Sequence, residues 1–412
     1  MQTSAAAKRR ALVIGSSMAG LFATALLRRA GWEADVFERS PIELFGRGAG
    51  IVTHEELLEA LELSGASLKD LGITVKERVA LGRNGEVIDR VDFEQIVTSW
   101  DRLHQIMRSV IPDNHHHLNH DLVSVEQTMS GVSATFANGR VEEADVLIGA
   151  DGYRSTVRGL YFPDVRPIYA GYIIWRGVAE ESELPPSLRE TFFEKFAFYL
   201  PERNKILGYP IAGSDNDLRK GRRRYNWVWY RPLEASSLPE MLTGNDGHRY
   251  ELSIPPPKIK RSFIDALRRD AMEFLPSAFS EILACIKQPF FTPIYDHVVP
   301  RMAVGRVALI GDAASVARPH VGMGVSKAAS DARVLADCLA RHDQSPERAL
   351  LEFHEKRLPV AQKAMSRGRD LGAYMLPHDV QPNSGRGVQH VDLHSVRGIL
   401  EHTASLAFLS PS

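Results

Sequence analysis

The N-terminal part of this chain has the order strand, tight turn, helix, strand. Residues 11–14 are an apolar strand, residues 15–20 a turn of small residues, and residues 21–30 an apolar helix that ends at Gly31. Residues 34–38 form the second strand. Two strands joined in this way make a βαβ unit, and the N-terminus of its helix is suited to binding a phosphate group. The chain is therefore predicted to begin with a Rossmann-like α/β domain.

The turn carries most of the residues that a dinucleotide-binding site needs. Gly15 permits the tight turn and Gly20 permits close packing of the helix. Glu38 follows at the usual distance of ~20 positions, where it can accept hydrogen bonds from an adenosine ribose. Ser17 stands where the fingerprint has its middle glycine, so a small side chain lies beside the expected pyrophosphate. By itself this fingerprint also fits an ordinary βα turn of another α/β fold.

Two further junctions place an acidic residue beside a glycine at the end of a predicted strand. Residues 141–150 are predicted to form a strand that turns into a helix through Asp151-Gly152. Residues 307–310 form an apolar strand that ends in Gly311-Asp312, and a small-residue helix follows to about Leu339. Such junctions put free backbone N–H groups and a carboxylate beside whatever binds at the carboxyl end of the strand.

Other segments predict antiparallel strands outside the nucleotide-binding unit. Residues 75–91 alternate in polarity around Asn84-Gly85, which is a hairpin signal. Residues 168–293 are rich in aromatic side chains, and residues 225–231 alternate as a strand does. One face of that strand carries Tyr225, Trp227 and Trp229.

Helix starts are expected at two places near the first domain. The glycine-dense residues 46–51 lead to Thr53, which forms a capping-box pattern with Glu56. Residues 100–107 are predicted to be helical, with Arg102 near the start, where it could reach a phosphate.

Composition and charge exclude several classes of partner. The chain has 412 residues, of which 44% are hydrophobic and 25% charged, and its formal net charge is -1. This balance gives no general attraction to nucleic acid or to an anionic membrane. No segment has the ~18 continuous apolar residues that a membrane span needs. A small-molecule partner is therefore expected.

The cysteines and the N-terminus indicate a cytoplasmic protein. Cys285 and Cys338 are the only cysteines, so no disulfide framework is expected. The basic residues 8–10 and the apolar run 11–27 imitate a secretory signal, but glycines break the run and no cleavage site follows. Residues 115–120 contain four histidines but no carboxylate or cysteine to complete a ligand set, so no metal site is predicted.

The chain resembles the FAD-dependent aromatic-ring monooxygenases of class A, the p-hydroxybenzoate hydroxylase class. Three motifs in the same order carry the resemblance: the N-terminal turn with Glu38, Asp151-Gly152 and Gly311-Asp312. The likeness covers almost the whole chain. Within that class the chain is most similar to the 2,6-dihydroxypyridine 3-monooxygenase branch. The shared features are the serine-bearing turn, the Gly-Ala-Gly-Ile loop, the strand Asn226–Arg231 and Arg318-Pro319-His320.

The resemblance implies an α/β fold with a Rossmann-like FAD-binding domain, an interleaved β-sheet substrate domain and C-terminal helices. The FAD-binding domain would comprise residues 8–75, 100–167 and 294–376, the substrate domain residues 76–99 and 168–293, and the tail residues 377–412. FAD would be the bound cofactor and NADH or NADPH the co-substrate. The partners would be O2 and a small aromatic or heteroaromatic ring, with formation of a homodimer left open.

The resemblance also assigns residues to the cofactor. Glu38 would hold the adenosine ribose, Arg102 would lie near the pyrophosphate, and Asp312 would bind the ribityl chain. Asp151 belongs to a motif linked to both FAD and the pyridine nucleotide, and residues 319–324 would run beside the isoalloxazine. The complete set of expected cofactor-binding residues is Gly15, Ser17, Met18, Ala19, Gly20, Glu38, Arg39, Arg47, Gly50, Arg102, Asp151, Asp312, Pro319, Gly322 and Gly324.

The implied reaction is hydroxylation of a hydroxylated aromatic or pyridine-type ring through a flavin C4a-hydroperoxide. A base near the substrate hydroxyl would assist it, and His320, His54 and Tyr230 are the candidates. Two other functions stay open from the sequence. An NAD-dependent dehydrogenase would need only the first fingerprint, and a flavin-binding accessory protein without oxygenase turnover could have the same sequence features.

Overall fold

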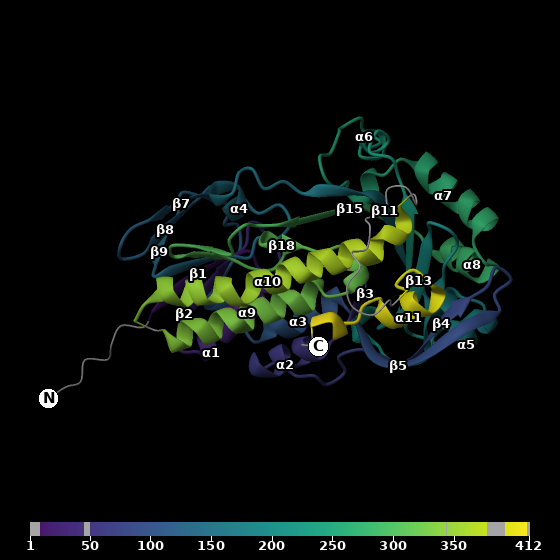
Figure 1. Cartoon of the computed structure of the whole chain (residues 1–412), viewed down its shortest axis with the longest axis horizontal. Coiled ribbons are helices and arrows are strands. Elements are labelled where there is room, and N and C mark those ends of the chain that lie inside the picture. The colour runs from purple at the N-terminus through teal and green to yellow at the C-terminus, as the bar shows by residue number, and fades with distance from the viewer. Residues whose placement is uncertain (1–8, 45–49, 343, 377–391, 410–412) are drawn as a thin grey trace.

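The computed structural model describes residues 9–44, 50–342, 344–376 and 392–409. Within these ranges the strands form sheets of six, nine and three strands, and helices cover them (Figure 1). The predicted fold class is confirmed: a mixed α/β fold with a Rossmann-like unit, a second large sheet and long C-terminal helices. Among the described residues no helix is long and apolar enough to span a bilayer.

The six-stranded sheet contains the Rossmann-like unit. Its order is β16 (Ala303–Val304), β17 (Val307–Leu309), β10 (Val146–Gly149), β1 (Arg10–Ile14), β2 (Glu33–Phe37) and β6 (His116–His117). β1 pairs in parallel with β2 and β10, so Ile14 lies opposite both Phe37 and Gly149. The three strand-to-turn junctions predicted from sequence therefore meet at one edge of this sheet, because the carboxyl ends of parallel strands lie side by side.

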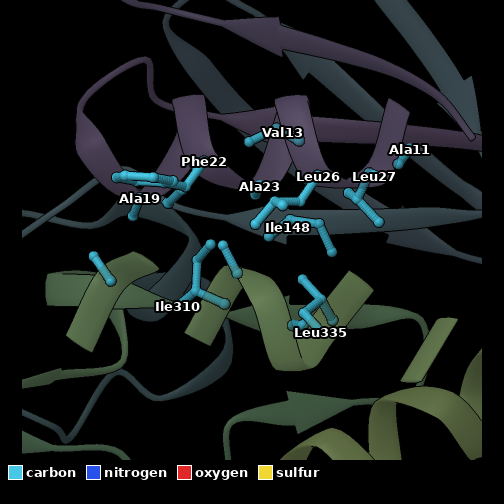
Figure 2. Packing of buried hydrophobic residues seen from close by; sticks show 14 of the residues in the cluster. Ala11, Val13, Ala19, Phe22, Ala23, Leu26, Leu27, Ile148, Ile310 and Leu335 are labelled. Carbon is cyan, nitrogen blue, oxygen red and sulfur yellow. The ribbon is translucent and has the colours of Figure 1, made fainter. Parts of the chain in front are cut away.

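Both faces of these parallel strands are buried, which explains their continuous apolar sequence. Figure 2 shows Leu26 of α1 (Met18–Arg29) next to Ile148 of β10, with Leu335 of α9 (Gly324–Arg341) facing them. All of these side chains belong to one buried cluster. The packing fixes the N-terminus of α1 beside the start of α9.

The nine-stranded sheet forms the second half of the molecule. Its order is β18 (Ser315–Val316), β15 (Phe290–Val298), β11 (Ile168–Glu180), β14 (Arg224–Pro232), β13 (Lys205–Ile211), β12 (Lys195–Tyr199), β4 (Ile73–Leu81), β5 (Val87–Ser99) and β3 (Gly50–Val52). The predicted alternation in β14 is confirmed. Tyr225, Trp227 and Trp229 pack into one buried cluster, and Val228 and Tyr230 pack into another on the opposite face.

The sheet also crosses the domain ranges expected from the sequence. β3 and β18 come from ranges assigned to the FAD-binding domain, yet they add strands to both ends of the sheet that holds β11–β14. Residues before and after the predicted substrate segments therefore contribute strands to the nine-stranded sheet.

Helices complete both halves. The remaining α-helices are α2 (Glu55–Leu63), α3 (Trp100–Ser109), α4 (Thr156–Tyr161), α5 (Pro186–Phe192), α6 (Leu238–Met241), α7 (Arg261–Phe274), α8 (Ser277–Cys285), α10 (Pro346–Gly372) and α11 (Val396–His402). α10 runs alongside α9, and α11 lies against β4 and β5 (Figure 1). The C-terminal segment thus returns to the nine-stranded sheet.

Three local expectations are corrected. Residues 141–150 are not one strand: β9 (Val141–Ala144) joins the three-stranded sheet with β7 (Leu122–Gln127) and β8 (Val132–Phe136), whereas β10 joins the six-stranded sheet. Asp145 lies between them and accepts hydrogen bonds from Arg9 and from the backbone of Arg10, which separates the two strands.

The other two corrections concern helix starts. α1 begins at Met18, three residues before the expected Leu21, because small residues of the turn are themselves helical. The prediction of a capping box between Thr53 and Glu56 is wrong. His54 is the N-cap residue of α2, and the Thr53 hydroxyl donates to the carbonyl of Ile96 instead, at 2.9 Å.

Candidate active site

Two adjoining cavities lie at the carboxyl edge of the six-stranded sheet. The small cavity has a volume of about 110 Å³ and lies beside Gly15, Glu38 and Asp151. The large cavity, of about 370 Å³, extends from the N-terminus of α1 to the nine-stranded sheet. Ser17, Ala150 and Gly152 line both of them. Together they form one elongated site between the two halves of the molecule.

Glu38 and Asp151 are the acidic residues of the small cavity. The Glu38 carboxylate accepts hydrogen bonds from the backbone N–H of Ser16 at 2.9 Å and of Ser40 at 3.0 Å. The Asp151 carboxylate accepts from the Ser155 hydroxyl at 2.5 Å and from the Val157 N–H at 3.1 Å. Burial raises the pKa of Asp151, and these hydrogen bonds oppose the effect. Both carboxylates are therefore held in place before any ligand binds.

The turn before α1 has the close packing that its glycines predicted. Gly15 adopts a φ of 99°, and a Cβ on Gly20 would lie 1.8 Å from the Gly15 carbonyl oxygen. Ser17 is the N-cap of α1 but makes no side-chain hydrogen bond to the helix. The first N–H groups of α1 thus have no side-chain acceptor, and Met18 and Ala19 line the large cavity. An anion can accept hydrogen bonds there.

Asp312 contributes the carboxylate of the large cavity. It follows β17 in a 3-10 turn and is exposed to the cavity, and within the described residues its carboxylate has no hydrogen-bond partner. Its position deep in the fold raises the pKa of Asp312, and the charge of Lys327 opposes the shift. A free acceptor in such a place is suited to the hydroxyl groups of a ligand.

A buried ion network holds the turn that carries Asp312. The Lys327 ammonium donates to the carbonyl of Gly311 at 2.8 Å and to Asp331 at 3.2 Å. Asp331 also accepts from the Gly311 N–H at 3.0 Å and from Arg357 at 2.8 Å. Burial alone would raise the pKa of Asp331, but the two cations outweigh it and the pKa is lowered. Side chains of α9 and α10 therefore hold the turn at Gly311 in place.

The far wall of the large cavity is one face of the nine-stranded sheet. Arg176 of β11 and Asn226 and Tyr230 of β14 all line it. Among the described residues, the buried Arg176 Nε and Asn226 Nδ2 have no hydrogen-bond partner. The Asn226 Oδ1 accepts from the Gly50 N–H at 3.3 Å, which orients the amide. This wall therefore presents a cation and a free N–H donor to a ligand.

His320 lies behind the wall rather than in the lining. It is buried, its Nε2 forms a hydrogen bond with the Tyr172 hydroxyl at 2.9 Å, and its ring stacks on Tyr230 with centroids 4.7 Å apart. Burial lowers the pKa of His320 well below its ordinary value. Burial also raises the pKa of Tyr230 to about 12, so its hydroxyl is a hydrogen-bond donor at neutral pH.

His54 and Arg102 lie away from both cavities. The Nε2 of His54 donates to the carbonyl of Ala404 at 3.1 Å, and its Nδ1 accepts from Ser326 at 2.8 Å. His54 lines a separate open groove of about 460 Å³. The Arg102 guanidinium donates to the Lys69 carbonyl and to Gln105.

The other predicted residues are distributed as follows. Gly15, Glu38, Arg39 and Asp151 line the small cavity, Ser17 lines both, and Met18, Ala19, Gly50, Tyr230, Asp312, Pro319, Gly322 and Gly324 line the large one. Arg47 lies outside the described residues. No group of acidic, histidine or cysteine side chains in the described part of the chain has a metal-binding arrangement. His115 instead bonds to Asp35 at 2.8 Å.

Sequence reasoning missed several residues of the large cavity. Arg176 interrupts the apolar run of β11, which is a signal for a charged group that faces a site. Placing Tyr225, Trp227 and Trp229 on the core face of β14 also implied that Asn226 and Tyr230 face the other way. Trp100, Lys327 and Thr403 had no comparable signal, because only the tertiary fold brings α3, α9 and the C-terminal segment together.

The combined site fits FAD. The acceptor pair of Glu38 and Asp151 lies at one end, the open N–H groups of α1 in the middle, and the unpartnered Asp312 carboxylate beyond them. A Cβ on Gly50 would lie 2.4 Å from the ring of Tyr209, so the wall there tolerates only glycine without a shift. A long molecule with a ribose, a pyrophosphate and a polyol chain matches this order of groups.

Comparison with protein families agrees with this reading. Residues 8–161 and 260–368 match a family model described as an FAD binding domain, and residues 169–296 match an FAD binding domain-like model. The chain is 32% identical over 372 residues to 2,6-dihydroxypyridine 3-monooxygenase of Paenarthrobacter nicotinovorans, covering 89% of this chain and 93% of that protein. It is 29% identical to 3-amino-4-hydroxybenzoate 2-monooxygenase of Streptomyces cremeus, with 88% and 86% covered.

Solved structures show the same relationship. The structure of 2,6-dihydroxypyridine-3-hydroxylase from Arthrobacter nicotinovorans superposes with a TM-score of 0.84 at 31% identity, covering 94% of this chain and 99% of that one. A match of this extent includes both halves of the site. The chain belongs to the family of FAD-dependent aromatic-ring monooxygenases of class A, whose FAD binding domain it carries.

Proposed function

We propose that this monooxygenase hydroxylates a small N-heteroaromatic ring that already bears a hydroxyl group, with NAD(P)H and O2 as co-substrates. The observation that carries the proposal is the large cavity, which joins the expected flavin side at Asp312 to a wall with unpartnered polar groups at Arg176 and Asn226. Similar proteins named for 2,6-dihydroxypyridine and 6-hydroxynicotinate support the substrate class. FAD, when bound, supplies hydride acceptance and oxygen activation.

The wall residues would bind and orient the ring. The Arg176 guanidinium stabilises an anionic ring oxygen, because a hydrogen bond between charged groups is stronger than a neutral one. The Asn226 Nδ2 donates to a second ring heteroatom, and the Tyr230 hydroxyl donates to the ring substituent nearest the sheet. The apolar side chains Phe196, Leu207 and Val228 exclude water from the same wall.

The cofactor assignments follow the two cavities. Glu38 and Arg39 would contact the adenosine end, the turn with Ser17 the pyrophosphate, and Asp312 the ribityl chain. Pro319 and the glycines after it would lie beside the flavin ring. Nothing in the geometry supports a role for Arg102, whose guanidinium bonds to the backbone of Lys69.

Of the three candidate bases, Tyr230 alone reaches the large cavity. His54 has both ring nitrogens engaged elsewhere, and His320 serves Tyr172 and Tyr230 from behind the wall. We therefore assign Tyr230 to substrate contact as a donor and His320 to the support of that wall.

The cytoplasm is the compartment that we propose for this activity, because NAD(P)H is supplied there and both cysteines are free thiols. The proposal concerns a single chain. Light scattering of the FAD-loaded protein tests whether it is nonetheless a homodimer.

The function is tested by measuring NAD(P)H oxidation by the FAD-loaded protein against a panel of hydroxypyridines and hydroxybenzoates, with product masses determined in parallel. The expected result is that a hydroxypyridine stimulates NAD(P)H oxidation and gains one oxygen atom. Preference for a hydroxybenzoate would overturn the heteroaromatic assignment. Bound FAD without any substrate-stimulated oxidation would favour an accessory flavoprotein instead.

A further inference from the structure

Lys205 is a buried lysine next to Thr403, which lines the large cavity, and its environment is unusual for a cation. Its side chain is 3% exposed. The Nζ forms a single hydrogen bond, 2.7 Å long, to the Thr403 hydroxyl, and in the described part of the chain no carboxylate pairs with it. A buried ammonium without a counter-ion is strongly unfavourable, so the neutral amine is the stable form over much of the physiological range.

A neighbouring charge acts on Lys205 in the same direction. β4 contributes the buried guanidinium of Arg78, and the 3-10 turn at residues 319–321 contributes His320, whose lowered pKa leaves its ring uncharged at neutral pH. The rings of Phe198 and Tyr230 each lie 5.7 Å from the Nζ. Burial first, and the charge of Arg78 second, lower the pKa of Lys205 to about 7. A neutral amine is a proton acceptor, which an ordinary lysine is not.

Thr403 connects this amine to the cavity. It lies directly after α11 and lines the large cavity together with Ala404 and Tyr230. The Arg78 guanidinium holds the segment by donating to the carbonyls of Leu400 at 2.8 Å and Thr403 at 2.5 Å. The N–H of Ala404 donates to the carbonyl of His320 at 2.9 Å. The Thr403 hydroxyl is therefore fixed between the cavity wall and Lys205.

We propose that Thr403 and Lys205 form a relay that removes the proton from the ring hydroxyl of the bound substrate. The substrate hydroxyl gives its proton to the Thr403 oxygen while the Thr403 hydroxyl proton passes to the Lys205 amine. The O–H bond of the substrate breaks and an N–H bond forms, leaving an oxyanion on the ring and an ammonium behind Thr403, with no change in oxidation state. The inference rests on the proposed function, because an oxyanion makes the ring more nucleophilic toward an electrophilic oxygen.

The relay also gives the C-terminal segment a role. The β13 strand places Lys205 opposite Tyr230 on β14, so the amine and the Tyr230 hydroxyl approach the cavity from neighbouring strands. Thr403, directly after α11, supplies a second hydroxyl beside that of Tyr230. The buried Arg78 guanidinium, which donates to the carbonyls of Leu400 and Thr403, and the backbone of His320 hold the Thr403 hydroxyl in position.

The experiment uses 4-nitrophenol as the probe, because its anion is yellow and its neutral form is not. It is added near neutral pH to the FAD-loaded protein without NAD(P)H, and the bound anionic fraction is measured by difference absorbance. Wild type and Thr403→Ser are expected to bind the probe as the anion. Lys205→Met and Thr403→Val should lower the ratio of bound anion to bound neutral probe by about tenfold, which corresponds to a rise of about one unit in the pKa of the bound probe. Lys195→Met is the control, because Lys195 pairs with Glu77 outside the cavity.

A second measurement follows the side-chain nitrogen resonance of Lys205 with pH in the FAD-loaded protein, assigned by comparison with Thr403→Val and Lys205→Met. Titration near pH 7 supports the relay, and titration at the ordinary lysine value overturns it. The relay is equally overturned if Lys205→Met and Thr403→Val still bind the probe as the anion. A wild-type protein that binds no nitrophenol would count against the proposed function. In that case the titration of the Lys205 resonance would be the test of the relay.

Discussion

The two halves of the active site hold their ligands by different means. In the cofactor half, the turn before α1 presents backbone N–H groups, the turn at Gly311 presents the Asp312 carboxylate, and Glu38 and Asp151 are already hydrogen-bonded. In the substrate half, the polar side chains of Arg176 and Asn226 project from strands and keep donors without partners. In the cofactor half, the carboxylates of Glu38 and Asp151 are thus held in place before binding and Asp312 stays open to a ligand, whereas in the substrate half the side-chain donors have hydrogen bonds left to make.

This difference has an energetic consequence. Backbone contacts change little when one side chain is replaced, so substitution of Ser17 in the turn before α1 should have a small effect on FAD binding, whereas Gly15 and Gly20 leave no room for a side chain. Unpartnered buried donors cost free energy in the empty protein, and a ligand with matching acceptors recovers that cost. The substrate half is therefore where the chain's specificity is expected to reside.

Asp312→Ala should have the largest effect, because within the described residues the Asp312 carboxylate has no hydrogen-bond partner, unlike those of Glu38 and Asp151. Loss of charge-assisted hydrogen bonds, at ~1.5–3 kcal/mol each, predicts a loss of about 10²-fold or more in FAD affinity. Flavin content after purification and titration with FAD measure it. Asp337→Ala, on the exposed side of α9, is the matched control. A fully loaded, tightly binding Asp312→Ala protein would remove Asp312 from the site.

Arg176→Met should affect the other half alone. We expect KM for a hydroxypyridine to rise by about 10- to 100-fold, from the loss of one hydrogen bond to a charged group, with the FAD content unchanged. Steady-state kinetics on the FAD-loaded variant measure the change, and Arg176→Lys should recover part of it. Arg90→Met, at an exposed position of β5, serves as control. A drop in FAD content with an unaltered KM would contradict the assignment of Arg176 to the substrate half.

Ser17→Gly should have the smallest effect, although it restores the missing glycine of the fingerprint. The Ser17 side chain makes no capping hydrogen bond, and replacement of an N-cap residue by glycine costs only a few tenths of a kcal/mol. We expect FAD affinity to change by less than about threefold, as measured by fluorescence titration. A much larger change in either direction would show that the side chain at position 17 contributes to the phosphate site.

Lys205 also predicts a pH dependence of stability. Its pKa is lowered in the folded protein to about 7 from the ordinary 10.5, so the unfolded chain binds more protons between these values. The free energy of unfolding contributed by this group therefore rises as the pH increases through that interval. Lys205→Met should lose this rise and be more stable near pH 7, by a few kcal/mol on the order expected for such a shift. Urea unfolding at two pH values measures it, and an unchanged pH dependence in Lys205→Met would contradict the burial of a neutral amine.

The sequence predicted those parts of the molecule that depend on local order. The turn before α1, Glu38, Asp151 and Asp312 each follow a strand directly, and parallel strands bring their ends to one edge. The alternation in β14 was equally local, because a strand places every second residue on the same face. Both predictions needed no knowledge of the rest of the chain.

The failures have physical reasons of a different kind. The Thr53 hydroxyl could either cap α2 or donate a hydrogen bond to a neighbouring strand. In the folded chain it donates to the Ile96 carbonyl on β5. His54 and His320 carry the right chemistry, but neither lines the large cavity. Both ring nitrogens of His54 are hydrogen-bonded elsewhere, and His320 is buried behind the wall with its Nε2 bonded to Tyr172. Lys205 and Thr403 are 198 positions apart, and only the docking of the last helix brings them together.

The most direct test of the central claim is the origin of the oxygen atom in the product. The FAD-loaded protein is supplied with NAD(P)H, 2,6-dihydroxypyridine and isotopically labelled O2, and the product mass is measured together with NAD(P)H consumption. The account predicts one labelled oxygen atom in the ring product for each NAD(P)H oxidised. Label that enters from water instead, or NAD(P)H oxidation that yields hydrogen peroxide with no hydroxylated ring from any compound of the panel, would contradict it.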